Sequence, residues 1–354
     1  MGRWLLPIFL AVIFIFRFPD YKENTQQTIT ITTNGNSYQN FGNLSIYLWS
    51  LSKIDPGSKV TISGTVGQEV TNNGNTRLIL SDPHIVKVVN PGTINLLSYR
   101  IRDTLSHNIE KTLGNESNLA LGLVFGGYSS PAFISTGLAH LMAASGYNVS
   151  LVSSMVTKIF GIHFGIVSTI LYMVVAGNTA SVMRAGIMNC LALIALMRGK
   201  IRDAEYILLI TALFMLALYP ELIYDIGFQL SVMATLGMIS FTNPVAPIIF
   251  TMPLILHYFG RVSVYAPLNN LIVGSLVAPA TQLSLLTGIF WPIGYLAWPV
   301  VKLLSELVSW LSTWPGASIV IGYLDWGWVI IYYLGLGVFL YSKKIASPPV
   351  GGSQ

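Results

Sequence analysis

The spacing of hydrophobic residues divides the chain into an alternating N-terminal part and a long series of apolar runs. Apolar and polar residues alternate with period two over residues 28–32, 45–49 and 60–66, which predicts β-strands, and residues 77–80 and 85–89 complete five strand candidates. Turn-forming pairs separate these segments: Asn34-Gly35, Asp55-Pro56, Asn73-Gly74 and Asp82-Pro83. Five short strands over residues 28–90 predict a small β-barrel, for which an OB-fold is the natural candidate.

Residues 91–118 predict a linker helix with one apolar face. Apolar side chains recur at helical spacing at Ile94, Leu97, Ile101, Leu105, Ile109 and Leu113. Charged and polar residues occupy the positions between them. An amphipathic helix of this kind is expected to lie on the membrane surface or against the barrel.

From residue 119 onward the chain consists largely of apolar runs. They cover residues 119–146, 148–176, 181–197, 205–219, 227–242, 247–260, 266–290, 293–312 and 326–341. A helix needs about 20 apolar residues to cross a bilayer, and glycine and proline interrupt several runs, so we expect roughly seven to ten crossings over residues 119–341. A broken or re-entrant segment is expected near Ser145 and Gly146.

The composition places most of the chain in a membrane. Hydrophobic residues make up 53% of the 354 residues and charged residues only 9%, whereas a soluble domain carries about 25% charged residues. The net charge of +5 is too small for a strongly basic nucleic-acid-binding domain. The predicted fold class is a polytopic α-helical membrane protein with a small N-terminal extracytoplasmic all-β (OB-like) domain.

The first residues predict a membrane anchor. The apolar run 4–18 lies between Arg3 and Arg17, and no small-residue cleavage site follows it. We therefore expect residues 1–19 to form an uncleaved N-terminal anchor rather than a signal peptide.

Basic residues predict the orientation of the chain. Residues 198–202 form the densest basic loop, and Lys343 and Lys344 follow the last apolar run. The positive-inside rule places both groups, with the tail 342–354, in the cytoplasm. The β-barrel then lies on the extracytoplasmic side of the cell membrane.

Three polar islands interrupt the apolar runs and mark a candidate substrate path. Polar groups at membrane depth are expensive, and they usually face a bundle interior or a water-filled path. The islands lie at residues 137–150, 178–189 and 225–231, and a further polar spot lies at residues 269–270. The residues expected to line the path are His140, Ser145, Gly146, Asn148, Asn178, Ser181, Arg184, Asp225, Gln229 and Asn270.

The most prominent of these residues also have structural interpretations. A guanidinium can hold a phosphate through two hydrogen bonds, so Arg184 suits an anion contact, but it could equally pair with Asp225 or with carbonyls at a broken helix. Gln229 can bond to a substrate or to a neighbouring helix. His140 can relay protons, meet phosphate, or bond to a carbonyl inside the bundle.

Aromatic residues of the predicted barrel suggest a second contact surface. OB-folds often bind single strands by stacking bases on aromatic side chains. Candidates for such stacking are Tyr38, Phe41, Tyr47 and Trp49. The alternative is that these rings fill the barrel interior or meet the bilayer.

No enzymatic pattern is evident, so we expect no catalytic residue, metal site or cofactor. The chain has no P-loop and no His-Glu-x-x-His, and its five histidines are scattered. An intramembrane serine hydrolase using Ser145 and His140 is the enzymatic alternative. Their spacing puts the side chains about 140° apart on a regular helix, so they would meet only where the helix breaks.

Four motifs, in their order and spacing, resemble the competence domain of the ComEC/Rec2 family. They lie at residues 137–146, 184–188, 227–231 and 253–279, the last containing Phe259-Gly-Arg-Val-Ser263 and Asn270-Leu-Ile-Val. The resemblance covers roughly residues 119–341, and the segment 28–90 is similar to the family's extracytoplasmic OB-like domain. Many members have a histidine where this chain has Asn148, which puts a proton- or phosphate-linked role of that position in doubt.

The resemblance implies an inner-membrane channel that passes single-stranded DNA into the cytoplasm during natural transformation. It also implies an extracytoplasmic DNA receptor and a cytoplasmic helicase-like motor as partners, besides the lipid bilayer. Many members carry a C-terminal metallo-β-lactamase-like domain, whereas this chain lacks His-x-His-x-Asp-His, so a separate nuclease is expected. The alternative is a small-solute or lipid-linked transporter on the same scaffold.

Overall fold

The computed structural model describes most of the chain after residue 25. The described residues are 26–32, 38–41, 44–48, 54, 58–70, 76–90, 92–126, 130–141, 146–177, 179–199, 203–241, 243 and 245–346. The predicted anchor 1–19 and the end of the predicted tail, residues 347–354, lie outside them.

The N-terminal part is a small, mainly antiparallel sheet. Its strands are β1 (Gln26–Thr32), β2 (Tyr38–Phe41), β3 (Leu44–Tyr47), β4 (Lys59–Val70) and β5 (Thr76–Val89), in the spatial order β1-β4-β5-β3-β2. Among the described strands of this sheet, β3 and β5 are the pair that is parallel. Residues of period two, such as Ile29 and Ile31 on β1 and Val60 and Ile62 on β4, form the buried face, as the alternation predicted.

One strand boundary was predicted wrongly. The segments 77–80 and 85–89 belong to a single strand, β5, and Asp82-Pro83 forms a bulge in it instead of a turn. Two residues of β5 oppose one of β4 here, because Ser63 pairs with His84 and Thr65 with Ser81. Residues in a bulge are left out of the strand pairing. The bulge therefore accommodates the positive φ of 48° at Asp82 and the proline, which has no N–H to donate. The fifth strand is instead β2, which the alternation pattern had not indicated.

The rest of the described chain is mostly helical. Its helices, in chain order, are α2 (Thr93–Leu113), η3 (Gly114–Glu116), α3 (Ser117–Phe125), α4 (Pro131–Ser135), η4 (Ala139–Leu141), α5 (Gly146–Phe160), α6 (Ile162–Ala176), α7 (Ala180–Met197), α8 (Ala204–Leu218), η5 (Pro220–Tyr224), α9 (Ile226–Ser240), α10 (Ala246–Phe259), α11 (Ala266–Ile289), η6 (Trp291–Ile293), α12 (Gly294–Ser312) and α13 (Trp326–Ala346). The short strands β6 (Arg261–Val262) and β7 (Ile319–Val320) pair antiparallel.

Side-chain caps fix the start of three successive helices. Thr179 precedes α7 and accepts from the N–H of Val182, and Asp203 precedes α8 and accepts from Tyr206. Asp225 likewise caps α9. Each cap satisfies an N–H group that has no partner within its own helix.

The predicted linker helix and the predicted break are both present. α2 matches the expected helix over residues 94–113, with Ile109 and Leu113 buried, although Leu97 is 60% exposed. The apolar run 119–146 is divided into α3, α4 and η4, and α5 begins at Gly146. Ser145, just before this start, lies outside the described residues.

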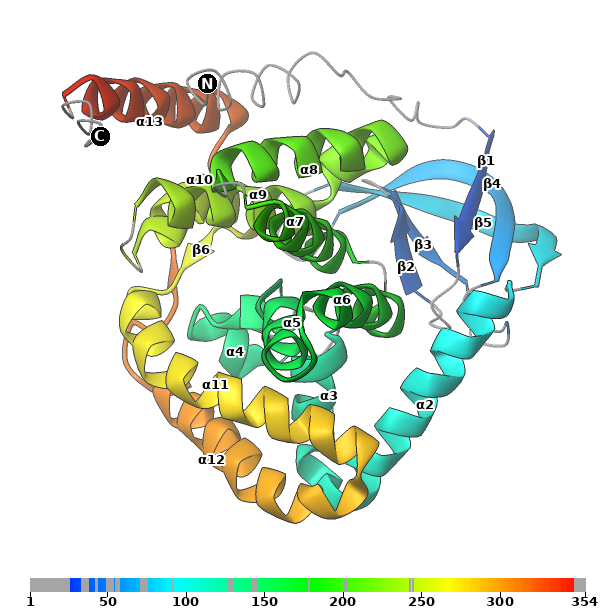
Figure 1. The fold of residues 1–354 in the computed structure, drawn as a ribbon. Coiled ribbons are helices and arrows are strands. Elements are labelled where there is room, and N and C mark those ends of the chain that lie inside the picture. The colour runs from blue at the N-terminus through cyan, green and yellow to red at the C-terminus, as the bar shows by residue number, and fades with distance from the viewer. Residues whose placement is uncertain are drawn as a thin grey trace.

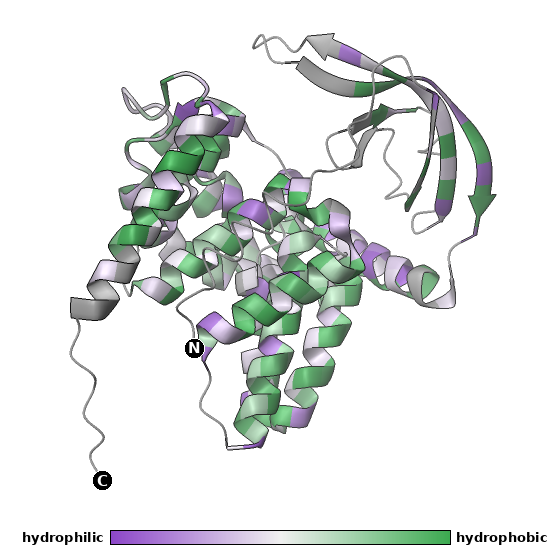
Figure 2. Ribbon diagram, turned by 90° about the horizontal axis from the view of Figure 1, so that it is seen from above, coloured by the Kyte–Doolittle hydropathy of each residue, from purple (hydrophilic) through white to green (hydrophobic). Residues whose placement is uncertain are grey.

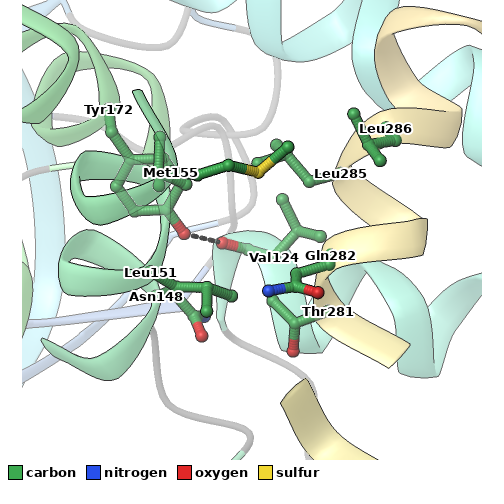
Figure 3. Close-up of a pocket in the computed structure, with 10 residues that line it drawn as sticks. Val124, Asn148, Leu151, Met155, Tyr172, Thr281, Gln282, Leu285 and Leu286 are labelled. Atoms are coloured by element: carbon green, nitrogen blue, oxygen red, sulfur yellow. Dashed lines mark hydrogen bonds between the residues drawn. The ribbon is translucent and has the colours of Figure 1, made fainter. Parts of the chain in front are cut away.

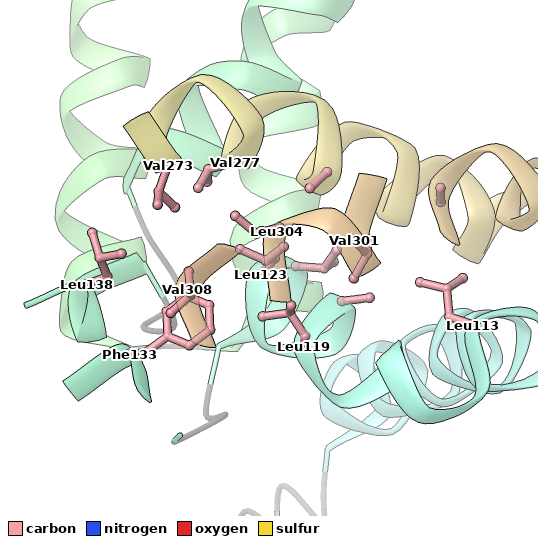
Figure 4. Packing of buried hydrophobic residues seen from close by; sticks show 14 of the residues in the cluster. Leu113, Leu119, Leu123, Phe133, Leu138, Val273, Val277, Val301, Leu304 and Val308 are labelled. Carbon is pink, nitrogen blue, oxygen red and sulfur yellow. The ribbon is translucent and has the colours of Figure 1, made fainter. Parts of the chain in front are cut away.

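Three hydrophobic cores organise the helices. The first joins α2, α3, α4, α11 and α12, and Figure 4 shows Leu123, Val301 and Leu304 packing within it. The second joins α7 to α10 with α13, around Phe228 and Phe250. The third lies between α5, α6 and α7, so α7 contributes to two cores.

The helices run in two main directions. In Figure 1, α5 and α6 are seen almost end-on in the centre, whereas α2, α11 and α12 lie in the plane and border them. The helical part is rich in hydrophobic residues throughout (Figure 2), including outward positions such as Phe164, Val167 and Leu171 of α6, which are 59%, 52% and 58% exposed. Large apolar side chains on an outer face mark a surface that meets lipid or protein.

Among the described residues, two helices, α7 and α11, are long and apolar enough to cross a membrane. Shorter apolar helices accompany them: α6, α8, α9, α10 and residues 326–339 of α13. The described chain is thus mostly helical with a small N-terminal sheet, and the predicted number of crossings stays a prediction.

Candidate functional site

Arg184 lies in the interior of the helices. Its side chain is only 8% exposed, and it extends from α7 toward α9. Nε donates to Ser231 Oγ at 2.9 Å, and Nη1 donates to Thr235 Oγ1 and contacts Met188 Sδ at 3.4 Å. All of these partners are uncharged.

The alternative that Arg184 pairs with Asp225 does not hold. Asp225 is exposed, and its Oδ1 accepts from the N–H of Phe228 at 2.6 Å as the cap of α9. Arg184 meets α9 farther along, at Ser231 and Thr235. Among the described residues, the ion pair that the structure contains is Lys302–Glu306, on α12.

Gly146 places the start of α5 directly against Arg184. A Cβ at Gly146 would lie 2.7 Å from the Cβ of Ala185 and 3.1 Å from Nη2 of Arg184. Only a residue without a side chain fits so close to α7. The structure therefore brings two predicted path residues, Gly146 and Arg184, into contact, with Ser181 half-buried one turn before Arg184.

Asn148 and Tyr172 hold the end of α3. Asn148 is 2% exposed, and its Nδ2 donates to the carbonyl of Leu123. Tyr172, on α6, donates its hydroxyl to the carbonyl of Val124 at 2.7 Å. The last carbonyls of a helix lack intrahelical partners, so these two side chains satisfy the C-terminal end of α3. The sequence predicted Asn148 as a path residue, whereas Tyr172 was missed because its partner lies far away in sequence.

A small cavity lies next to these bonds, between α3, α5, α6 and α11 (Figure 3). Its volume is ≈ 30 Å³, and Leu151, Met155 and Leu285 line it together with Thr281 and Gln282. Thr281 Oγ1 is buried without a hydrogen-bond partner among the described residues. A cavity of this size has room for about one water molecule, so it is too small for a nucleotide in this conformation.

Gln229 forms hydrogen bonds with groups on neighbouring helices. Its side chain is 7% exposed, with Nε2 donating to the carbonyl of Ile223 at 2.6 Å and Oε1 accepting from Tyr258 at 3.0 Å. These contacts join η5, α9 and α10. They favour the interhelical interpretation of Gln229 over a substrate contact.

His140 and Asn270 meet at a second place, where η4 lies against the start of α11. The imidazole of His140 lies beside the Asn270 side chain and the backbone of Gly137. Gly137 has a φ of 76°, and a Cβ there would lie 2.8 Å from Ala266, so only glycine permits this approach. The neighbouring Asn269 is 1% exposed and donates to the carbonyl of Thr136 at 2.9 Å.

A polar cluster that the sequence analysis did not predict joins α5, α6 and α7. Asn189 Nδ2 donates to Ser153 Oγ at 2.7 Å and to Thr169 Oγ1 at 2.8 Å. Both hydroxyls also donate to the carbonyl of Gly165. Asn189 therefore contributes to packing between these helices.

The other predicted residues are placed as follows. Ser145, Asn178 and Trp49 lie outside the described residues, so the serine hydrolase alternative stays open. Tyr38 and Phe41 lie on β2, and Tyr47 at the end of β3 is 66% exposed. The described path residues thus group at Arg184 and Gly146, at Asn148, at Asp225 and Gln229, and at His140 and Asn270.

Comparison with known proteins identifies a family. A family model described as Competence protein matches residues 129–249 and 244–345, which contain all of these helical sites. No curated protein and no solved structure matches the chain.

Proposed function

Because the chain belongs to the Competence protein family, with the ComEC membrane domain over residues 129–345, we propose that it forms the channel that passes single-stranded DNA into the cell. Membership of this family implies a role in DNA uptake and competence. The candidate membrane helices and the family together indicate a membrane protein. The channel itself, its substrate and its direction are the proposal.

Arg184 carries the proposal. A buried guanidinium within apolar helices is expensive, about 2.5–3.5 kcal/mol even on the gentler scales. Its described partners are all neutral, so its charge is free to attract an anion. The phosphodiester backbone of DNA is such an anion, and guanidinium is the side chain best suited to it.

The proposed arrangement is a multi-pass protein of the cell membrane. We place the N-terminal sheet outside the cell and the C-terminus in the cytoplasm, as the basic loop 198–202 and Lys343-Lys344 favour. The strand order and the parallel β3–β5 pair are compatible with an OB-like barrel opened between β1 and β2. The exposed Tyr47 offers a ring on which a base could stack.

The proposed partners follow from what this function requires. An external receptor would deliver one DNA strand, a helicase-like motor in the cytoplasm would supply the energy, and a separate nuclease would degrade the other strand. This chain would itself act as a channel and not as an enzyme, with no cofactor.

Uptake of labelled DNA tests the proposal. A strain lacking this protein is complemented with the wild type, with Arg184→Ala, or with Arg198→Ala as a control on the exposed end of the same helix. We expect Arg184→Ala to lose uptake at normal membrane levels, and Arg198→Ala to retain it. Normal uptake by Arg184→Ala, or by the strain without the protein, would reject the channel. Loss of a labelled small solute instead of DNA would favour the transporter alternative.

A further inference from the structure

Helices α5 and α11 face each other across the small cavity of Figure 3. On α5 the cavity is lined by Asn148, Leu151 and Met155, which recur at helical spacing and therefore share one face of the helix. On α11 it is lined by Leu285 and Leu286. Apart from the amide of Asn148, these facing side chains are apolar.

This α5–α11 interface separates two hydrophobic cores. α11 packs in the core that it shares with α2, α3, α4 and α12, whereas α5 packs in the core that it shares with α6 and α7. The hydrogen bonds that Asn148 and Ser153 of α5 make to other helices reach α3, α6 and α7. Among the described residues, no hydrogen bond joins α5 to α11.

The interface is also loosely packed. Protein interiors contain few voids, because an apolar atom that faces a void loses its dispersion contacts. Here a cavity of ≈ 30 Å³ remains between the helices, and Met155, which extends toward Leu285 in Figure 3, is 44% exposed. Thr281 Oγ1 is buried beside the cavity with no hydrogen-bond partner among the described residues. An unpaired buried hydroxyl destabilises the closed interface relative to an open one that admits water.

We propose that Leu151 and Met155 of α5, with Leu285 and Leu286 of α11, form a hydrophobic seal in the transport path, which is closed in this structure. Apolar constrictions gate membrane channels by excluding water, and ions do not cross where water is excluded. A path wide enough for a DNA strand would otherwise let ions leak across the membrane. The seal opens when α5 and α11 separate.

The position of the interface connects the seal to the predicted path. Asn148, a predicted path residue, lines the same cavity, and Gly146 begins the same helix beside Arg184. The bonds from Asn148 and Tyr172 to the end of α3 close one side of the interface, so the helices would separate on the other side. The seal adds gating to the proposed function, and it rests on that function for the identity of the substrate.

Ion leak tests the seal without any DNA. The full chain is reconstituted in liposomes with a K⁺ gradient, and the leak of K⁺ is recorded for the wild type, Leu151→Ser and Leu171→Ser. Leu171 is 58% exposed on α6, so it receives the same change away from the interface. We expect Leu151→Ser to raise the leak several-fold, because a hydroxyl admits water to the constriction, and Leu171→Ser to leave it unchanged. An equal leak from the two variants overturns the seal.

A reversible cross-link tests opening without weakening the interface. In a Cys190→Ser background, Leu151→Cys and Leu285→Cys are joined by a short bis-methanethiosulfonate reagent, and DNA uptake is measured in cells that lack the native protein. The control pair is Phe160→Cys with Phe164→Cys, at the turn between α5 and α6, where the two ring centroids lie 6.0 Å apart. We expect the cross-link between α5 and α11 to abolish uptake, a reducing agent to restore it, and the control cross-link to leave uptake unchanged. Normal uptake by the protein with α5 joined to α11 rejects a seal that opens.

The two tests separate the seal from the choice of DNA as substrate. If Leu151→Ser leaks more than Leu171→Ser while the strain without the protein takes up DNA normally, the seal stands and the proposed function fails. If Leu151→Ser does not leak and the cross-linked protein takes up DNA, while Arg184→Ala loses uptake, the seal is wrong and the channel proposal survives.

Discussion

At the scale of single residues, Gly146 is the position in the candidate site that leaves no space for a side chain. Gly146→Ala would place a Cβ 2.7 Å from the Cβ of Ala185 and 3.1 Å from Nη2 of Arg184, in a close contact between α5 and α7. Overpacking of this kind costs about 1–3 kcal/mol. We expect a lower free energy of unfolding in detergent and a loss of DNA uptake, because α5 must move away from Arg184.

Gly274 provides a matched control for this substitution. It lies within a helix, α11, and nothing lies within 4 Å of the position its Cβ would occupy. Gly274→Ala should be neutral or stabilise by about 0.5–1 kcal/mol, since alanine loses less backbone freedom in a helix. Equal stability of Gly146→Ala and Gly274→Ala would show that the contact is looser than described.

The sequence predicted the polar residues of the site better than their partners. Arg184 and Gly146 stand out because a cation and a helix-breaking glycine interrupt apolar runs. Arg184 contacts Ser231, Thr235 and Gly146, which lie about 40 to 50 residues away in sequence. Such contacts depend on how the helices pack, so the local sequence pattern cannot predict them. Asn148 and Gln229 were expected to face a path, yet both bond to carbonyls that are free only because α3 and η5 end where they do.

At the scale of elements, a proline in α10 leaves a carbonyl free for a hydrogen bond from α13. Pro253 has no N–H, so the carbonyl of Ile249 lacks its helical partner. Tyr332 of α13 donates to this carbonyl at 3.1 Å, and Tyr333 donates to the next one, Phe250, at 2.8 Å. Tyr332→Phe should therefore destabilise the chain by about 0.5–1.5 kcal/mol, measured by unfolding in detergent.

A double-mutant cycle separates this bond from ordinary packing. Pro253→Ala restores an N–H that can reach Ile249, so Tyr332→Phe should cost less in that background. Tyr295→Phe serves as the control, because Tyr295 is 72% exposed. An unchanged cost of Tyr332→Phe with and without Pro253 would contradict the role of the free carbonyl.

Elements with a clear period were predictable, and those shaped by a partner were not. The period of α2 and the alternation of β1 and β4 are local, and each matches the structure. The bulge at Asp82 was taken for a turn because Asp-Pro is a turn signal, and only Gly64 on the facing strand leaves room for it. A Cβ at Gly64 would lie 2.8 Å from the carbonyl oxygen of Ser81.

At the scale of the whole molecule, length and hydropathy do not fix how helices cross the bilayer. α11 is long and apolar enough for a span, and it lies in the plane of the picture in Figure 1. The apolar helix α6 is seen nearly end-on beside α5, so apolar helices of this chain run in different directions. Tilt depends on which faces pack together and on anchoring side chains, neither of which the composition records. Orientation is different, because it depends on the charge of the loops.

Cysteine labelling in whole cells tests the orientation directly. The chain has a single cysteine, Cys190, so a Cys190→Ser background leaves only an introduced thiol. Thr65 is exposed on β4, and Arg198 is exposed at the end of α7 beside the basic loop. A membrane-impermeant maleimide should label Thr65→Cys in intact cells and Arg198→Cys only after the cells are opened, because the positive-inside rule puts them on opposite sides. Labelling of Arg198→Cys in intact cells would reverse the orientation, and the N-terminal sheet could then no longer receive DNA from outside.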